Sequence, residues 1–391
     1  MPKMPSTALR FAAMPIIIGL IAWIETRQPF TFFRLVSLIL AFFLLADVAS
    51  LMRGKSRDLA LALASLVFGL SLIEGAATAL EVKQMLVVTP GWSVFQPITG
   101  WGAEHPGRYH AVRTDPKTGA TIYSADYTID SNLLRQTNSA KTGPAIVFFG
   151  DSFTFGFGVN DADTLPQLFA DSLDRKQRVL NLGVGGFGPQ QFLREMQTGL
   201  YDSVIGPQPK LFIFMTAVWH AERTACKYSW GAHAPLYAVE NDQLVFKGAC
   251  YEGLGLWAQQ FLWNSASYRL FVEPFRQKMS HDDIELYIRI VLAAVKLAKE
   301  KYGVPTLIPY IPEKEDYFAG TGFSDEAIIQ RLTDGGAIVI DVSIDQKAGN
   351  ESPLKIPGDG HPTPLANRIR AGMLKTFIQQ HISDVLLSKL E

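Results

Sequence analysis

Long apolar runs with few charges occupy most of the first 85 residues of the chain. Three of them, Ala8 to Ile24, Leu35 to Met52 and Leu59 to Leu80, come near the roughly 17 to 25 residues with which a helix crosses a bilayer. The pattern predicts a three-helix transmembrane region over residues 1–84. A cleaved signal peptide is the competing interpretation of the first and shortest run, but the two apolar runs directly after it favour an uncleaved anchor.

A different pattern follows the apolar runs. Residues 85–143 are rich in Gly, Pro, Thr and aromatic residues, and residues 119–130 alternate like an edge strand, which predicts a β-rich neck. From Pro144 onward, apolar strand runs alternate with amphipathic helices. The predicted strands are 145–149, 178–182, 211–216, 306–311 and 337–341, and the predicted helices are 164–174, 190–198, 284–302, 325–334 and 365–379. This alternation predicts an α/β fold over 144–391, a three-layer, flavodoxin-like parallel sheet with helices on both faces.

The charge balance narrows the possible partners. The chain has 36 Lys and Arg residues against 37 Asp and Glu residues, a net charge of -1. Such a chain has no basic field with which to hold nucleic acid phosphates, so no nucleic acid partner is expected.

Basic residues near the span ends predict the orientation, because Lys and Arg in short loops are retained in the cytoplasm. Those at the predicted inner ends are Lys3, Arg10, Arg53, Lys55 and Arg57, and those at the outer ends are Arg27, Arg34 and Lys83. The excess lies on the side opposite the C-terminal domain. We therefore expect a multi-pass protein of a bacterial cytoplasmic membrane, with the lipid bilayer as a partner and the large domain on the outer, periplasmic side.

Two carboxylates interrupt the predicted spans. A charge buried in a bilayer is costly, so Asp47 and Glu74 are candidates for a transport or relay role. Each also lies within about two turns of a span end, where it can be protonated or reach the interface. A protonated or interfacial carboxylate is the simpler interpretation of both residues.

The 2 cysteines, Cys226 and Cys250, both lie in the predicted external domain. In an oxidising compartment such a pair can form a disulfide. Two free buried thiols would give the same sequence, and bridging requires a close approach of the two Cα atoms.

The first candidate for chemistry directly follows the first predicted strand of the α/β domain, where residues 148–156 read Phe-Phe-Gly-Asp-Ser-Phe-Thr-Phe-Gly. The glycine lets the backbone turn sharply, and Ser152 can then present its hydroxyl above the sheet while its N–H points at a bound acyl oxygen. Capping of the next helix is the alternative role for this serine.

The second candidate is the glycine loop of residues 181–188, Asn-Leu-Gly-Val-Gly-Gly-Phe-Gly, which contains a G-x-G-x-x-G match. A dinucleotide site would need an acidic residue near the end of the next strand, and residues 214–216 read Phe-Met-Thr. This argues against NAD. Backbone N–H groups of such a loop can equally stabilise an oxyanion.

The third candidate lies between Pro357 and Pro364, just before the last helix, and contains Asp359 and His361. Two residues that are two apart in an extended segment point the same way, and the prolines and the helix would hold them still. A lone histidine is more often structural, but a histidine paired with an aspartate fits a general base.

Together these three sites resemble the SGNH (GDSL-like) hydrolase superfamily over roughly residues 145–383. The matching positions are Gly150, Asp151, Ser152, Phe153, Gly156 and Gly158 in the first block, Asn181 and Gly186 in the second, and Asp359, Gly360 and His361 in the last. Many members separate the final Asp and His by one residue more. The resemblance implies that Ser152 is the nucleophile, His361 the general base and Asp359 the group that orients it, with the N–H groups of Ser152 and Gly186 forming an oxyanion hole.

The third block departs from the family pattern. Members carry Gly-x-Asn-Asp, in which the Asn side chain is an oxyanion donor, whereas residues 216–223 read Thr-Ala-Val-Trp-His-Ala-Glu-Arg. This resembles a bacterial branch with a His and an Arg here. Either His220 replaces the Asn as donor, or the hole relies on backbone N–H groups alone, and an uncompensated loss costs about 100- to 1,000-fold in rate. We also expect Asp151 and Arg223 to contact the substrate.

The implied reaction is acyl transfer by a serine-dependent ester hydrolase or O-acyltransferase acting on an acylated glycan or lipid at the cell envelope, with neither metal nor other cofactor. An insertion at about 224–282 is a candidate lid or binding loop. Its aromatic residues are Tyr228, Trp230, Tyr237, Trp257 and Trp263, which suit either sugar rings or a local core. The alternative function is a non-catalytic binding or assembly protein in surface polysaccharide export.

Overall fold

A computed structural model describes residues 6–26, 33–81, 85–91, 93–313, 315–344 and 353–382. The chain forms two compact units, which we call the helical unit (Met1–Val82 with Glu252–Lys278) and the α/β unit (Lys83–Tyr251 with Met279–Glu391). The predicted insertion at 224–282 is thus divided between the two units. The predicted neck and the predicted α/β domain lie in the same unit, the α/β unit. Lys3, Arg27 and Lys83, used above for the orientation, lie outside the described residues.

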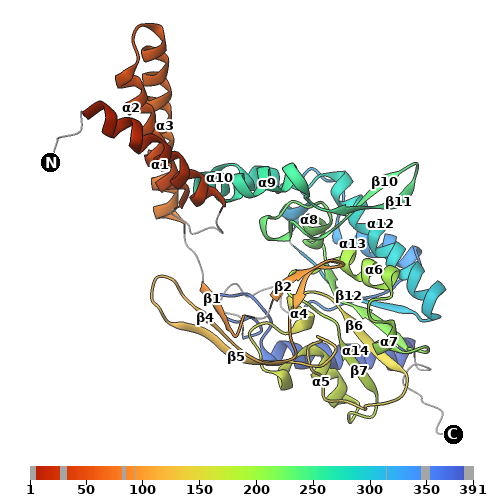
Figure 1. Cartoon of the computed structure of the whole chain (residues 1–391). Coiled ribbons are helices and arrows are strands. Elements are labelled where there is room, and N and C mark those ends of the chain that lie inside the picture. The colour runs from red at the N-terminus through yellow and green to blue at the C-terminus, as the bar shows by residue number, and fades with distance from the viewer. Residues whose placement is uncertain are drawn as a thin grey trace. The chain divides into compact units, whose positions relative to one another are not determined.

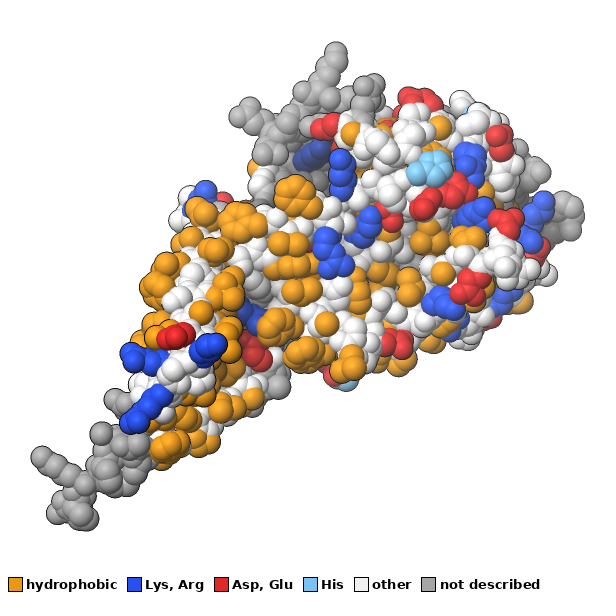
Figure 2. Space-filling model, turned by 90° about the horizontal axis from the view of Figure 1, so that it is seen from above, with side chains coloured by type: hydrophobic (Ala, Val, Ile, Leu, Met, Phe, Trp, Pro, Cys, Tyr) orange, Lys and Arg blue, Asp and Glu red, His pale blue; other side chains and the backbone are white. Residues whose placement is uncertain are grey.

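The helical unit begins with three helices that overlap the predicted spans: α1 (Ser6–Thr26), α2 (Phe33–Leu51) and α3 (Lys55–Leu80). By length and composition α2 and α3 could cross a membrane, and the apolar part of α1, Phe11–Glu25, is shorter. Large hydrophobic side chains are exposed along all three helices and cover much of their visible face in Figure 2. This is unlike the core helices of soluble proteins, which bury such residues. The unit is completed by α9 (Gly253–Trp263), α10 (Ala266–Phe271) and α11 (Glu273–Arg276).

A parallel sheet forms the centre of the α/β unit (Figure 1). Its strands are β6 (Ala145–Phe149), β7 (Arg178–Asn181), β8 (Leu211–Phe214), β12 (Thr306–Ile311) and β13 (Ile338–Asp341), in the order β13-β12-β8-β6-β7, with β9 (Thr216–Ala217) beside β12. All of these pairs are parallel. Because parallel strands end at the same edge, the segments after β6, β7 and β8 meet there.

Helices cover both faces of this sheet, which confirms the predicted fold class. Val147 and Phe149 of β6 face a core shared with α6 (Pro189–Thr198), α12 (His281–Leu297) and α13 (Asp325–Asp334). Ile146 and Phe148 face the opposite core, shared with α5 (Leu165–Ser172) and α14 (Pro364–His381). Such alternation is what a strand buried on both faces requires. Shorter helical segments are α4 (Ser152–Phe155), η1 (Asp161–Asp163), α7 (Asp202–Ile205), α8 (His220–Thr224), η2 (Ser229–Gly231), η3 (Ala298–Tyr302) and η4 (Glu315–Phe318).

The neck is β-rich, as the composition predicts. An antiparallel sheet has the order β1-β4-β5, and β2 pairs with β3. The strands are β1 (Met85–Thr89), β2 (Ser93–Gln96), β3 (Gly100–Ala103), β4 (Gly107–Thr114) and β5 (Thr121–Ile129). The alternating segment is the edge strand β5, whose inward residues pack with Phe155 and Val159 from the segment after β6. The neck is therefore part of the wall around the first motif.

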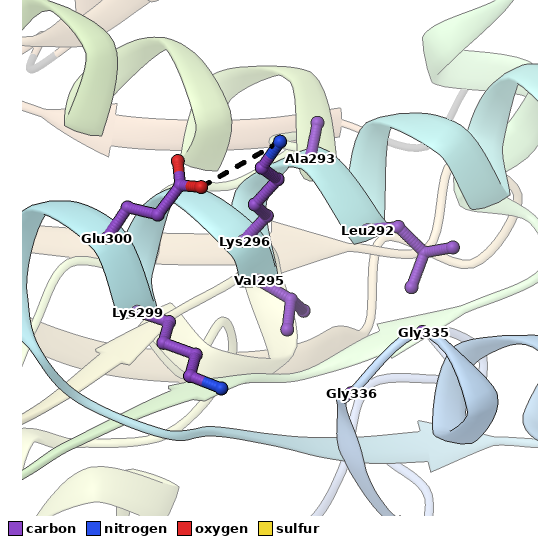
Figure 3. A pocket seen from close by; sticks show the side chains of 8 residues that line it. All are labelled: Leu292, Ala293, Val295, Lys296, Lys299, Glu300, Gly335 and Gly336. Carbon is purple, nitrogen blue, oxygen red and sulfur yellow. Dashed lines mark ion pairs between the residues drawn. The ribbon is translucent and has the colours of Figure 1, made fainter.

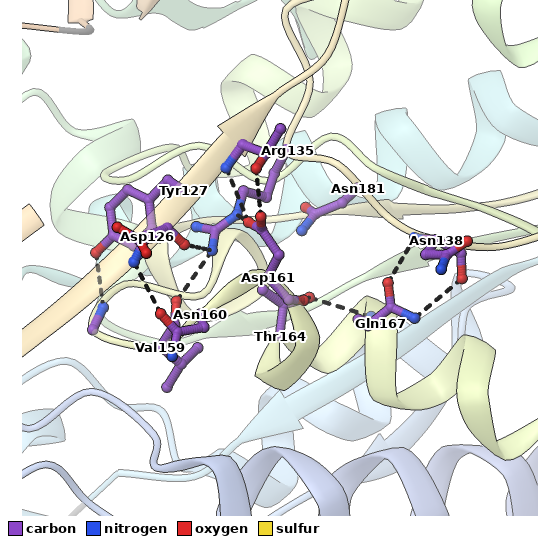
Figure 4. A network of polar contacts seen from close by, with 12 residues as sticks. Asp126, Tyr127, Arg135, Asn138, Val159, Asn160, Asp161, Thr164, Gln167 and Asn181 are labelled. Carbon is purple, nitrogen blue, oxygen red and sulfur yellow. Dashed lines mark hydrogen bonds and ion pairs between the residues drawn. The ribbon is translucent and has the colours of Figure 1, made fainter. Parts of the chain in front are cut away.

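A buried arginine joins the neck to this motif (Figure 4). The Arg135 side chain pairs with Asp161 at 2.8 Å, donates to the Val159 carbonyl at 3.1 Å and lies over the rings of Tyr127 and Phe155. Asp161 in turn accepts from the backbone and hydroxyl of Thr128 in β5. Burying the charge of Arg135 is tolerated because its guanidinium is paired and hydrogen-bonded.

The first half of the predicted insertion forms the hairpin β10 (Pro235–Glu240) and β11 (Gln243–Ala249). Cys226 and Cys250 form a disulfide with their Cα atoms 5.6 Å apart, which closes this hairpin onto α8. The second half of the insertion is the α9–α11 segment of the helical unit.

Candidate active site

The first motif places Ser152 at the start of a short helix. Asp151 is the N-cap of α4, and its side chain accepts from the Phe153 amide at 2.9 Å. The capping role considered for Ser152 is therefore filled by Asp151. This leaves the Ser152 hydroxyl without a capping role, directly after β6 at the carboxyl edge of the sheet.

Asp359 and His361 lie in a tight turn rather than in the extended segment that the sequence predicts. The amides of Asp359 and Gly360 both donate to the Ile356 carbonyl, and the Ile356 amide donates to the His361 carbonyl at 2.8 Å. Gly358 and Gly360 have φ values of +74° and +90°, which allow the chain to reverse here. The turn folds the His361 ring back onto the Asp359 carboxylate.

These three side chains form a continuous hydrogen-bonded chain. His361 Nε2 lies 2.9 Å from Ser152 Oγ, and His361 Nδ1 contacts Asp359 Oδ1, which also accepts from the His361 amide at 3.1 Å. Residues 209 positions apart thus meet in the arrangement that activates a serine nucleophile. The rings of Phe153 and Phe157, both at 5.6 Å between centroids, flank the imidazole and limit its movement.

Arg113 adds a contact that the sequence analysis missed. This residue of β4 pairs with Asp359 Oδ2 at 2.5 Å, and the Asp359 side chain is fully buried. Burial alone would raise the pKa of Asp359, but the hydrogen bonds from His361 and the charge of Arg113 outweigh it and hold the pKa below its usual value. The alternation along β4 indicates that Arg113 faces inward, because it lies two residues after Ala111 and four after Tyr109, which both face the core.

The glycine loop lies directly against the first motif. Asn181 Nδ2 donates to the Thr154 carbonyl and Asn181 Oδ1 accepts from the Gly183 amide, both at 3.0 Å. A Cβ on Gly183 would lie 2.5 Å from the Phe155 amide nitrogen, so no larger residue allows this approach. In the described part of the chain, the amides of Ser152 and Gly186 donate to no other protein atom. Both remain available to an incoming oxyanion.

His220 is engaged on both ring nitrogens. Nε2 lies 3.1 Å from Asp151 Oδ2, and Nδ1 lies 2.9 Å from Thr216 Oγ1, which in turn contacts Tyr287. Burial and the nearby Arg223 lower the pKa of His220 to about 4, so the ring is neutral at pH 7. This arrangement leaves neither nitrogen for an oxyanion, so of the two alternatives it favours the one in which the hole relies on backbone N–H groups alone.

Arg223 and Asp151 likewise contact each other rather than open solvent. Arg223 Nη1 pairs with Asp151 Oδ2 at 2.9 Å and also donates to the Phe187 carbonyl in the glycine loop. Burial would raise the pKa of Asp151, but Arg223 and His220 together hold it far below its usual value. The cluster of Asp151, His220 and Arg223 therefore links all three segments that surround Ser152.

The aromatic residues of the predicted insertion have different surroundings. Tyr228 and Tyr237 are buried in the α/β unit, so they are local core. Trp230 is 55% exposed and lies against Gly186, where a Cβ would come within 2.2 Å of its ring. Trp257 and Trp263 belong to the helical unit. Of the five, Trp230 is the one placed beside the candidate oxyanion hole.

One pocket lies elsewhere in the α/β unit (Figure 3). Its volume is about 610 Å³, and its lining residues are Leu292, Ala293, Val295, Lys296, Lys299, Glu300, Gly335 and Gly336. The lining contains none of the residues of the three motifs, and its charged pair, Lys296 and Glu300, is solvent-exposed at 3.7 Å. We do not assign a function to it.

No family model and no curated protein matches the chain. It is similar to a lipolytic protein of the G-D-S-L family from Veillonella parvula DSM 2008 (14% identity, 61% of this chain and 100% of that one, TM-score 0.35). It is also similar to a carbohydrate esterase family 2 enzyme with a carbohydrate binding domain from Corynascus thermopiles (13%, 78% and 89%, TM-score 0.35). A further similar structure is AlinE4, an SGNH-hydrolase family esterase (15%, 64% and 100%, TM-score 0.29).

At these identities and TM-scores the likeness carries no functional argument of its own.

Proposed function

We propose that the chain is a serine-dependent enzyme that hydrolyses an acyl ester or transfers its acyl group to a sugar or lipid hydroxyl at the cell envelope. The observation that carries the proposal is the chain of contacts from Asp359 through His361 to Ser152, with 2.9 Å between His361 Nε2 and Ser152 Oγ. Helix capping or core packing of these residues would not require this alignment.

The reaction follows the general scheme for a serine nucleophile. His361 takes the proton from Ser152 Oγ as this oxygen attacks the ester carbonyl carbon, and the amides of Ser152 and Gly186 hold the resulting oxyanion. His361 then gives its proton to the departing alkoxide, which leaves an acyl group on Ser152. Water as the second acceptor completes hydrolysis, and a sugar or lipid hydroxyl completes transfer.

A fluorophosphonate probe tests this proposal, because it reacts with an activated serine. We expect covalent labelling of the wild-type chain, none of Ser152→Ala, and full labelling of Ser203→Ala, in which an exposed serine of α7 is removed. Labelling that persists in Ser152→Ala, or its absence from the wild type, would contradict the assignment of the nucleophile.

The second candidate is a non-catalytic binding or assembly protein in surface polysaccharide export. The absent Asn of the third block and the full engagement of His220 favour it, because both remove an oxyanion donor. Labelling of Ser152 without turnover of any ester, in hydrolysis or in transfer to added sugar or lipid hydroxyls, would support this candidate over the enzyme.

We also propose that the helical unit anchors the chain in a bacterial cytoplasmic membrane with the α/β unit on the outer side. The apolar and largely exposed helices α2 and α3 support membrane insertion, and Arg53, Lys55 and Arg57 between them support a cytoplasmic location for that loop. The disulfide in the α/β unit supports an oxidising compartment.

Reporter fusions test this topology. A C-terminal alkaline phosphatase is expected to be active and a C-terminal fluorescent protein that folds only in the cytoplasm is expected to be dark. The reverse pair of results would place the α/β unit in the cytoplasm.

A further inference from the structure

The segment from α9 to α11, residues 253–276, belongs to the helical unit although more than 170 residues separate it from α3 in sequence. We call it the returning segment. It leaves the α/β unit at Tyr251 and rejoins it at Met279, so the chain passes between the two units three times. The following argument rests on the proposed membrane anchoring of α1–α3.

Glu74 of α3 holds the returning segment in place. It is 1% exposed, and its carboxylate accepts from the hydroxyls of Ser265 and Ser267 at 2.7 and 2.6 Å and from the amides of Ala266 and Ser267 at 2.6 and 3.0 Å. Four hydrogen bonds satisfy a buried carboxylate. A structural clamp onto α10 therefore accounts for Glu74, and the relay role considered from the sequence is not needed.

Two arginines complete the attachment at the same end of the helices. Arg269 of α10 forms a two-pronged ion pair with Glu81, at 2.6 and 2.8 Å. Arg34 of α2 pairs with Glu25 of α1 at 3.1 Å, donates to the Phe261 carbonyl of α9 and lies 3.7 Å from the centre of the Phe261 ring. The attached end is thus the C-terminal end of α3, from which the chain continues into the α/β unit.

The outward face of the returning segment is apolar. Leu254 and Phe275 are 87% and 82% exposed, and Trp257 is 59% exposed, whereas the polar Gln259 on the same helix is buried. The exposed large hydrophobic residues of the segment are Leu254, Trp257, Phe261, Leu262, Leu270, Phe271, Val272 and Phe275. A polar residue inside and apolar residues outside is the reverse of the pattern in a soluble helix. A patch of this kind marks a surface that contacts lipid or protein.

Continuity and chemistry favour lipid as the occupant. The apolar face adjoins α3 through α10, and α3 itself exposes Leu66, Leu70, Leu72 and Ile73. The 11 residues of α9 are too few to cross a bilayer, which takes about 20. Tryptophan and tyrosine side chains within the segment and the basic Arg276 and Lys278 at its end suit the headgroup region.

We propose that the returning segment lies in the membrane interface, in the leaflet on the side of the α/β unit, with its apolar side chains among the lipid acyl chains. The α/β unit is then attached to the membrane by this internal segment as well as by the end of α3.

Site-directed fluorescence of the full chain tests this proposal. Leu254→Cys and Phe275→Cys are each labelled with a polarity-sensitive probe, because Cys226 and Cys250 are consumed in the disulfide. The chain is reconstituted in vesicles of phosphatidylethanolamine and phosphatidylglycerol, with or without phosphatidylcholine brominated on its acyl chains. Leu66→Cys in α3 is the control for a membrane-spanning position, and Gln243→Cys in β11, at the exposed hairpin of the same insertion, is the control for solvent.

We expect the probes at 254 and 275 to emit at shorter wavelength and to be quenched by brominated lipid, as at 66, with no quenching at 243. Quenching at 66 but not at 254 and 275 would overturn the inference while leaving the anchoring intact. A shift to shorter wavelength at 254 and 275 without quenching would also overturn it, because a second copy or another protein would then cover the face. Absence of quenching at 66 would instead contradict the membrane anchoring itself.

Discussion

The contact between Arg113 and Asp359 allows a sharp test of how the hydrogen-bonded chain of Ser152, His361 and Asp359 is held. Asp359 Oδ1 is occupied by His361, and Oδ2 is paired with Arg113 at 2.5 Å, so Arg113→Met removes the partner of a fully buried oxygen. Breaking a buried ion pair on one side costs at least about 3 kcal/mol of stability. A charge-assisted contact contributes about 1.5 to 3 kcal/mol, and if it is fully expressed in the transition state its loss lowers kcat/KM roughly 10- to 150-fold.

The pH profile separates this role from a merely structural one. Arg113 is one of the groups that hold the pKa of Asp359 below its usual value, so its removal raises that pKa. In the proposed mechanism the Asp359–His361 pair must not carry an extra proton, and loss of the positive charge of Arg113 favours that extra proton. The acid limb of kcat/KM should therefore move to higher pH in Arg113→Met. Arg113→Lys restores the positive charge but not the planar guanidinium group with its paired N–H donors. The acid limb of kcat/KM should therefore return toward the wild-type position, while part of the loss in rate remains.

The assay is hydrolysis of a chromogenic acetyl ester from acid to neutral pH, with circular dichroism as a check of folding. Arg108→Met is the matched control, because Arg108 lies on the same strand with an exposed side chain. If Arg113→Met keeps kcat/KM within about twofold of the wild type and its acid limb does not move, Arg113 does not position Asp359.

Three further predictions concern stability and the oxyanion loop. The pKa of His220 falls from 6.5 to about 4 on folding, so stability is complete above pH 6.5 and about 3 kcal/mol is lost as the pH falls from there to about 4. In His220→Gln the melting temperature should fall less than in the wild type as the pH is lowered through this range. The exposed His105→Gln should keep the wild-type fall, and equal falls in the two variants would refute the reasoning. Gly186→Ala should lower kcat at least about tenfold, because an L-residue at φ +84° is strained and its Cβ meets Trp230. Gly206→Ala has a similar φ of +86° with open space around it, so it should lose stability but keep activity, and equal activities in the two variants would count against the oxyanion role. Reduction of the Cys226–Cys250 disulfide, which closes a loop of 24 positions, should lower the unfolding free energy by roughly 3 kcal/mol in a denaturant titration, and an unchanged midpoint would disagree.

The sequence predicted the parallel sheet well because its strands are short apolar runs with few alternatives. The bounds of β6 (Ala145–Phe149), β12 (Thr306–Ile311) and α13 (Asp325–Asp334) agree with the predicted ones to the residue. Strands buried on both faces and helices with one apolar face leave strong periodic patterns. The three motifs follow from the same reasoning, because turns at the carboxyl edge of a parallel sheet meet whatever their distance in sequence.

Contacts between segments that are far apart in the sequence could not be predicted from it. The sequence places Arg113 on the inward face of a neck strand but does not say that this face meets the turn of Asp359. The turn itself was predicted as extended, since alternation along a strand was the simplest way to align Asp359 with His361. The continuity of residues 224–282 in sequence predicts a single insertion, whereas the second half of this segment packs on α3, about 190 residues earlier. No local pattern encodes such partners.

The third block differs from the family pattern in what its side chains contact around Ser152. An Asn side chain there would point at the oxyanion, but His220 and Arg223 point at Asp151, the residue that caps the helix of Ser152. Arg223 also contacts the Phe187 carbonyl, one residue beyond Gly186, so the same cluster fixes both segments that carry the proposed oxyanion donors, the amides of Ser152 and Gly186. In the proposed mechanism the cluster therefore fixes the two backbone donors and does not supply a side-chain donor of its own. Since preorganised donors act by being held still, a rigid pair recovers part of the stabilisation that the missing Asn would give, and the remaining deficit makes a slow enzyme the physical expectation.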